Sequence, residues 1–236
     1  MRTRQNRIFH ILALIFIHNE IIPPEAVTML QNTGNCFSFM THDVTDEGIA
    51  GHPDVFCCKV GNQLVAAPQI IRLLKNNYAH IVPGASPVGF GFDATHYNAV
   101  VTDRYIIHNQ KYTDPEIISM QNGRTFINVK QGFTRCSVLP LPDGSFITSD
   151  KGISKVLDDS HIRHLLVSSE DIVLPGYRNG CIGGCFGIID NLVFVIGQLK
   201  FHRDGYAIKS YIETAGCRLT ELYDGPLFDG GSIIIL

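Results

Sequence analysis

The sequence lacks tryptophan, a surplus of basic residues and any apolar run long enough to cross a membrane. Its 19 Lys and Arg against 22 Asp and Glu give a net charge of −3, so little charge is left to neutralise phosphates. The apolar stretch at residues 8–17 is shorter than the ~20 residues that span a bilayer, and no small-x-small cleavage site follows it. We therefore expect a buried strand there, no nucleic-acid partner and no membrane association.

The cysteines neither pair evenly nor show the spacing of a zinc site. There are seven of them, at positions 36, 57, 58, 136, 181, 185 and 217. An odd number without an export signal indicates free thiols in a reducing compartment, which predicts a cytoplasmic protein. Cys181 and Cys185 have no second close Cys/His pair to complete a structural zinc site. We expect no metal and no other cofactor.

Glycine and short apolar runs are abundant, and they recur with a period. With 22 Gly and 45% apolar residues, the 236-residue chain is expected to form one strand-rich domain over residues 1–236. Four segments share an order of glycine, strand, tight turn, strand, helix and final strand. They begin at Gly51, Gly91, Gly132 and Gly180. Such spacing is typical of propeller-like arrays.

A fifth unit begins at Gly225 and stops after its first strand. The strand at 8–17, a helix at 23–32 and a strand at 36–40 supply the missing elements, so we expect the last strand to pair beside the first. The predicted class is α+β, a five-bladed α/β-propeller of pseudo-five-fold ββαβ units. The approximate units are 51–90, 91–130, 131–179, 180–223, and 224–236 together with 8–50.

Several phrases of the sequence resemble an uncharacterised bacterial family that has the pentein, or guanidino-modifying-enzyme, fold. They are residues 51–54, 111–115, 129–137, 148–153 and 182–184. The resemblance covers nearly the whole chain. The superfamily includes arginine, agmatine and dimethylarginine deiminases, amidinotransferases and a non-catalytic ribosome-binding initiation factor, so the resemblance implies the fold but leaves the activity open.

The resemblance also implies a chemistry, in which a Cys attacks a guanidinium carbon, a His moves protons and two carboxylates hold the cation. The nucleophile of such enzymes follows a Gly-Gly turn in the last repeat. Here that place reads Gly230-Gly231-Ser232 and holds no cysteine.

The repeats themselves indicate another set of candidates. Counting back from the hairpin turns leads to or near Asp54, His96, Cys136, Cys185 and Ser232. Seven residues separate the first three from their turns, but five separate Cys185 from its turn. In a five-fold ring these side chains would meet at one mouth of a central channel, where thiols beside a base suit nucleophilic chemistry. The residues that flank the same strand ends are His52, Lys130, Gln131, Asp150 and Lys151.

Two hypotheses follow, both with a small-molecule ligand in the central channel and neither specifying an oligomeric state. In the first, a cysteine-dependent hydrolase or amidinotransferase acts on a small guanidine- or amidine-like substrate. Its nucleophile is Cys185, with Cys136 as the alternative, and His96 is the base. The substrate-binding residues are Asp54, Asp150, His52, Lys130, Gln131 and Ser232. In the second hypothesis, a non-catalytic binding module has kept the ring and lost the chemistry.

Most of these residues also have a structural interpretation. Cys136 and Cys185 could be small buried apolar residues, and His96 a structural histidine. Asp150 could cap a helix, and Lys130 could be a solvated charge at a strand edge.

Overall fold

The computed structural model describes residues 14–87 and 89–236. The first part of the strand predicted at 8–17 lies outside these residues, and its described part opens strand β1 (Leu14–Asn19). The helix predicted at 23–32 is α1 (Pro24–Gln31), and the strand predicted at 36–40 is β2 (Gly34–Phe39).

Five three-stranded sheets in the described residues share one pairing pattern, in which the middle strand is antiparallel to one neighbour and parallel to the other. Four of them are built from consecutive strands: β3 (Cys57–Val60), β4 (Gln63–Ala66) and β5 (Ile81–Pro83); β6 (Val100–Val101), β7 (Tyr105–His108) and β8 (Thr125–Asn128); β9 (Val138–Pro140), β10 (Phe146–Thr148) and β11 (His164–Leu166); β13 (Phe186–Ile189), β14 (Leu192–Val195) and β15 (Arg218–Glu221). Each antiparallel pair is a hairpin, as the turn residues predict.

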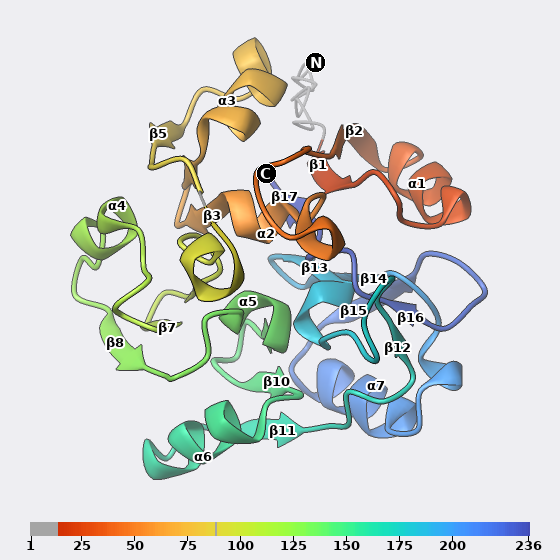
Figure 1. The fold of residues 1–236 in the computed structure, drawn as a ribbon. Coiled ribbons are helices and arrows are strands. Elements are labelled where there is room, and N and C mark those ends of the chain that lie inside the picture. The colour runs from red at the N-terminus through yellow and green to blue at the C-terminus, as the bar shows by residue number, and fades with distance from the viewer. Residues whose placement is uncertain (1–13, 88) are drawn as a thin grey trace, which may run out of the picture.

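The fifth sheet joins the two ends of the described chain. β17 (Ile234–Ile235) pairs antiparallel with β1, and β1 pairs parallel with β2. Phe16 lies opposite Ile235, and Ile17 lies opposite Ile234. The expectation that the last strand pairs beside the first is therefore confirmed, and Figure 1 shows β17 next to β1 and β2.

A two-stranded sheet of β12 (Ile172–Val173) and β16 (Leu227–Phe228) has no counterpart in the predicted repeat. It ties the segment after β11 to the segment before β17. Its strands are too short to carry a periodic pattern in the sequence.

Longer helices connect the second and third strands of the sheets, and Figure 1 shows several of them at the outside of the molecule. They are α1, α3 (Pro68–Leu74), α4 (Pro115–Ser119), α6 (Lys151–Asp159) and α7 (Gly205–Thr214). Asp114 and Asp150 cap α4 and α6 by accepting from backbone N–H groups of the first turn. Apolar side chains such as Ile153, Leu157, Ile208 and Ile212 are buried, which holds the helices to the sheets.

Short helical turns occupy the segments beside the strands. Two are α-helical, α2 (Pro53–Phe56) and α5 (Thr134–Ser137). The 3₁₀ turns are η1 (Glu47–Ile49), η2 (Lys75–Asn77), η3 (Gly91–Ala94), η4 (Gly183–Cys185) and η5 (Leu199–Phe201). α2, α5 and η4 each end where the first strand of a sheet begins. Among the described residues, no helix has the length and apolar character needed to cross a membrane.

Candidate functional site

The site is built from α2, α5, η4 and the segment before β17. Asp54 stands three residues before its strand, Cys136 two residues before its strand, and Cys185 directly before its strand. Successive residues of a helical turn point about 100° apart, so these positions face different directions. The structure accordingly brings Cys136 to Asp54 and places Cys185 elsewhere.

A buried polar cluster of His52, Asp54, Cys136 and Ser232 lies where these segments meet. Cys136 Sγ is 3.3 and 3.2 Å from the two carboxylate oxygens of Asp54, and Ser232 Oγ donates to Asp54 Oδ2 over 2.6 Å. All four side chains are between 0 and 3% exposed. A thiol, a carboxyl, an imidazole and a hydroxyl are thus held together away from water.

Asn98 fixes the thiol to the carboxylate segment. Its Nδ2 lies 3.2 Å from Cys136 Sγ and donates to the Asp54 carbonyl over 3.2 Å, while its Oδ1 accepts from the Cys136 N–H over 3.1 Å. Asn98 was not predicted from the sequence. The sequence shows only that an asparagine, which strands disfavour, stands directly before the apolar run Ala99–Val101, and its full burial is seen only in the structure.

His52 is buried without a hydrogen-bond partner on either ring nitrogen. Its ring packs against Gly231, where an added Cβ would lie 2.2 Å from His52 Cβ. Native proteins rarely leave buried polar groups unpaired, because the desolvation cost is not recovered. One potential ligand atom each of His52, Asp54 and Cys136 lies within 4.8 Å of the others, so the unpaired imidazole could accept a proton or bind a ligand there.

Burial determines the protonation of the cluster. It raises the pKa of the Cys136 thiol well above its usual value, and the neighbouring Asp54 and Asp229 carboxylates add to the rise. It also raises the pKa of Asp54, against the opposing effects of His52, the Ser232 hydrogen bond and Arg135. Burial lowers the pKa of His52, although Asp54 opposes this. The resting cluster therefore holds a neutral thiol and a neutral imidazole at neutral pH.

Asp229 supports the backbone around the cluster and was also missed from the sequence. Its carboxylate accepts from Cys181 N–H over 2.8 Å and from Gly231 N–H over 3.0 Å. Burial raises its pKa to about 6, with the two backbone hydrogen bonds and Arg135 opposing the rise. Gly184 packs so closely that an added Cβ would lie 1.9 Å from Asp229 Oδ1, which explains why a glycine is needed there.

Arg135, the third unpredicted residue, binds backbone rather than a carboxylate. Nη1 donates to the carbonyls of Val138 (3.2 Å) and Gly183 (2.9 Å), and Nη2 donates to the carbonyl of Phe186 (3.1 Å). The guanidinium thereby connects the start of β9 with η4 and β13. Its charge lowers the pKa of both Asp54 and Asp229.

The other predicted site residues lie outside the buried polar cluster. Cys185 is fully buried among apolar side chains and donates to the Cys181 carbonyl over 3.5 Å. His96 is half-buried, with Nδ1 2.9 Å from the Tyr112 carbonyl. Asp150 caps α6 and accepts from Gln131 Nε2 over 3.0 Å.

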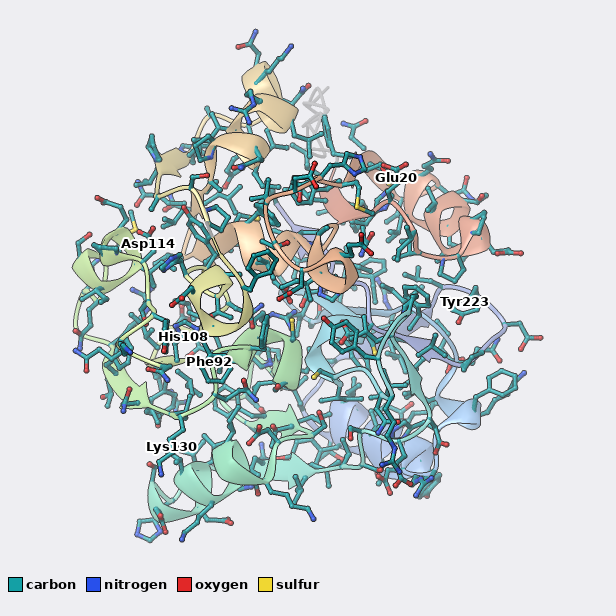
Figure 2. All side chains as sticks on the ribbon, viewed as in Figure 1. Glu20, Phe92, His108, Asp114, Lys130 and Tyr223 are labelled. Carbon is teal, nitrogen blue, oxygen red and sulfur yellow. The ribbon has the colours of Figure 1, made fainter. Side chains whose placement is uncertain are left out.

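Lys130 is exposed, and Figure 2 shows it away from the centre of the view. Of the residues predicted for the site, the structure brings together four: His52, Asp54, Cys136 and Ser232.

This arrangement can act in two chemical ways. A thiol beside an unpartnered imidazole is the pair that cysteine nucleophiles use. The imidazole nitrogen, thiol sulfur and carboxylate oxygen of His52, Cys136 and Asp54 are also donor types that Zn²⁺ accepts.

Comparison with solved structures identifies the class of fold. The chain is similar to a mutant of DDAH from Pseudomonas aeruginosa complexed with citrulline (TM-score 0.52, 9% identity, 88% of this chain and 91% of that one). It is also similar to SxtG, an amidinotransferase from Microseira wollei (0.51, 14%, 89% and 88%), and to C. jejuni agmatine deiminase (0.51, 8%, 89% and 87%). These structures share the pentein fold, and so does this chain.

The particular family follows from the sequence. A family model described as "Family of unknown function (DUF6873)" matches residues 17–234, and the chain belongs to that family. No curated protein matches the sequence.

Proposed function

We propose that the protein modifies a small guanidine- or amidine-like group, with Cys136 as the nucleophile, His52 as the base and Asp54 as the carboxylate that holds the cation. The observation that carries this proposal is the buried contact between the Cys136 thiol and the Asp54 carboxylate beside an unpartnered imidazole. The similarity to pentein structures supports it at the level of the fold. Cys185 becomes the less suitable nucleophile because its surroundings are apolar.

The proposed reaction begins with proton transfer from the Cys136 thiol to a ring nitrogen of His52. The thiolate then attacks the amidine carbon, forming a C–S bond. The C–N bond to the leaving amine breaks as the His52 imidazolium returns its proton to that amine. Attack by water releases the product and restores the thiol in a hydrolase; attack by an acceptor amine does so in an amidinotransferase.

A bound cation would itself prepare the nucleophile. Burial and two nearby carboxylates disfavour the thiolate in the resting protein. A guanidinium placed between Cys136 and Asp54 would favour the charged form of both groups, since opposite charges a few ångströms apart stabilise one another. The thiol would then ionise mainly when the substrate is present.

Substrate entry requires movement, because the cluster is closed. The segment that leads into His52, residues 41–51, contains no strand and only one short 3₁₀ turn, and most of the hydrogen bonds it makes are within itself, such as the two that Thr41 donates to the Ala50 carbonyl. We infer that displacement of residues 41–51 opens the site.

Two broader features belong to the same proposal. The shared strand pattern and the pairing of β1 with β17 support a pseudo-five-fold propeller with the cluster near its axis. The free thiols of the seven cysteines support a cytoplasmic location.

The alternative is a non-catalytic binding module. It is favoured by Ser232, which stands where the resemblance predicts the nucleophile and is instead hydrogen-bonded to Asp54. A serine hydroxyl without its own base is a weak nucleophile.

The test compares matched cysteine variants of the full-length protein. Wild type, Cys136→Ala and Cys185→Ala are assayed for ureido or urea products with agmatine, arginine and dimethylarginine, and for amidino transfer between amines. We expect Cys136→Ala to lose at least ~1000-fold in kcat/KM and Cys185→Ala to stay within about threefold. Activity that survives in Cys136→Ala would exclude the proposed nucleophile. No turnover with any substrate, together with iodoacetamide labelling of Cys136 that none of them accelerates, would favour the binding module.

A further inference from the structure

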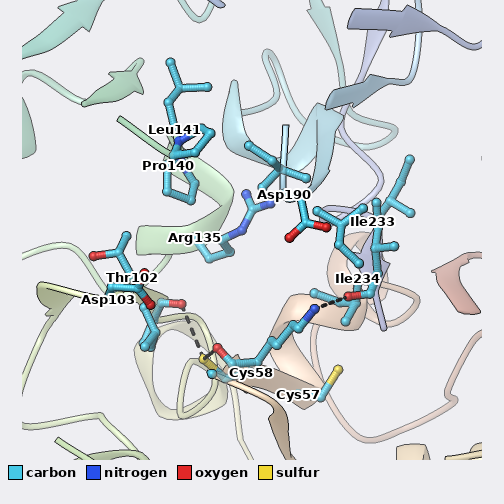
Figure 3. A pocket seen from close by; sticks show the side chains of 18 of the residues that line it. Cys57, Cys58, Thr102, Asp103, Arg135, Pro140, Leu141, Asp190, Ile233 and Ile234 are labelled. Carbon is cyan, nitrogen blue, oxygen red and sulfur yellow. Dashed lines mark hydrogen bonds between the residues drawn. The ribbon is translucent and has the colours of Figure 1, made fainter. Parts of the chain in front are cut away.

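A second site lies at the opposite end of the first strands from the buried polar cluster. The cluster precedes these strands, whereas a cavity of about 480 Å³ is lined by the turns that follow them. We call this cavity the hairpin pocket. Its turn residues include Gly61, Asp103, Gly144 and Asp190, and β17 forms a further wall. Figure 3 shows the pocket from close by.

Three cations line the hairpin pocket without a carboxylate partner. They are Lys59, Arg104 and Arg135, and within residues 14–87 and 89–236 none of them has a carboxylate oxygen within 4.0 Å. A guanidinium has five N–H donors. The two terminal nitrogens of Arg135 donate to three carbonyls, so some of its donors remain unused. Lys59 has one acceptor, the Ile235 carbonyl at 2.9 Å, for three donors.

The rest of the lining limits what these donors can bind. Two acidic residues, Asp103 and Asp190, leave one cation in excess. Figure 3 shows Arg135 and Asp190 facing the same space. The remaining walls are largely apolar and include Leu141, Ile189 and Ile234. A pocket of this kind favours an organic anion over an inorganic one, since apolar walls add affinity only for an apolar body.

We propose that the hairpin pocket is a binding site for a small organic carboxylate. The carboxylate accepts hydrogen bonds from Lys59 and Arg135, and the apolar part of the molecule packs against Leu141 and Ile234. Guanidinium and ammonium groups with unused donors are the usual partners of carboxylates. The site is distinct from the buried polar cluster, because none of His52, Asp54, Cys136 and Ser232 lines the pocket.

The test uses benzoate and its uncharged analogue benzamide as probes, with calorimetric titration of the full-length protein at low salt. We expect benzoate to bind at least tenfold more tightly than benzamide and more tightly than inorganic phosphate. Lys59→Met is expected to weaken benzoate binding about tenfold, as the loss of one charge-assisted hydrogen bond of about 1.4 kcal/mol or more would do. Arg104→Gln, at the exposed rim, is expected to weaken it about threefold.

Lys209→Met, on the exposed face of α7, is the matched control and should bind benzoate as wild type does. Cys136→Ala should also bind benzoate normally, which separates this site from the proposed catalytic one. Equal affinity for benzoate and benzamide, tighter binding of phosphate, or unchanged binding in both Lys59→Met and Arg104→Gln would each overturn the proposal. Circular dichroism of the variants checks that each has folded.

Discussion

The two ends of the first strands of the sheets carry polar groups in different surroundings. At the buried polar cluster, a carboxyl, a thiol and an imidazole are packed together with at most 3% exposure. Burial raises the pKa of the carboxyl and of the thiol and lowers the pKa of the imidazole, so it favours the neutral form of each group. At the hairpin pocket, which has a volume of about 480 Å³, burial lowers the pKa of Lys59 and of Arg135, and nearby acidic groups oppose this: Asp190 for Lys59 and Asp54 for Arg135. The centre of the molecule thus separates a closed cluster of neutral groups from a cavity that is lined by cations.

Arg135 belongs to both regions. Its guanidinium lines the hairpin pocket, and its charge lowers the pKa of Asp54 in the cluster. The side chain therefore acts on both regions, and its removal is the first test of how they differ.

The largest expected effect on stability is that of Arg135→Met. The variant removes the guanidinium donors from three backbone carbonyls at the centre of the molecule, and we expect it to lower the free energy of unfolding by about 3–5 kcal/mol. Urea denaturation followed by circular dichroism measures the change. Arg104→Met, an exposed arginine of the same pocket, is the control and should stay within about 0.5 kcal/mol. Equal losses in the two variants would contradict the structural role of Arg135.

The second prediction concerns pH and the carboxyl that supports the cluster. The pKa of Asp229 is about 6 in the folded protein against 3.8 as its reference value, so the folded state holds the proton more tightly. The contribution of Asp229 to stability is therefore largest at low pH and is lost as the pH rises from about 4 to about 6. Across this range the loss attributable to Asp229 should be on the order of 2–3 kcal/mol.

Asp229→Asn should remove this part of the pH dependence, because asparagine does not titrate. The measurement is urea denaturation of wild type and variant at pH 4.5 and pH 7. The exposed Asp224→Asn variant should keep the wild-type pH dependence. An unchanged pH dependence in Asp229→Asn would show that other buried groups, such as Asp54, dominate it.

A smaller effect is expected at Ser232, which donates to Asp54 while holding φ at +66°. Ser232→Ala loses the hydrogen bond and keeps the unfavourable backbone, so we expect a loss of about 1–2 kcal/mol. Ser232→Gly loses the same bond but relaxes the backbone, and should be more stable than Ser232→Ala by about 0.5–1 kcal/mol. Thermal or urea unfolding of the two variants measures the difference, and the reverse order would show that the left-handed backbone costs little here.

The smallest effect is expected outside both regions, at the exposed ion pair of Lys200 and Asp224. Lys200→Ala should change the free energy of unfolding by less than about 0.5 kcal/mol, because solvent screens exposed pairs. The same denaturation experiment tests it. A change as large as that of Ser232→Ala would mean that surface charge matters as much as the central region.

The candidate site was only partly predictable, and the thiols show why. Counting seven residues back from the turn leads to Asp54, His96 and Cys136, and the structure brings Asp54 and Cys136 together but leaves His96 outside the cluster. Cys185 is five residues from its turn, and it lies in the apolar core. A difference of two positions in a helical turn redirects a side chain by more than half a turn, so an approximate register selects segments but not side chains.

Asn98, Arg135 and Asp229 escaped notice for a related reason. Each acts through backbone groups of segments far away in the sequence, such as the Gly183 carbonyl for Arg135 and the Cys181 N–H for Asp229. No local pattern marks a residue whose partners are 48 positions away.

The sequence by itself determined the strands of the five repeated sheets and their turns, the helix cap at Asp150, and the pairing of the last strand with the first, because hydrophobic periodicity and turn chemistry are local and repeated. Only the tertiary structure decided which thiol meets a carboxyl, which histidine is left without a partner, and which arginine reaches a cavity. Those outcomes depend on the direction in which each short helical turn points its side chains and on burial by several sheets at once. Neither can be read from the residues of a single segment.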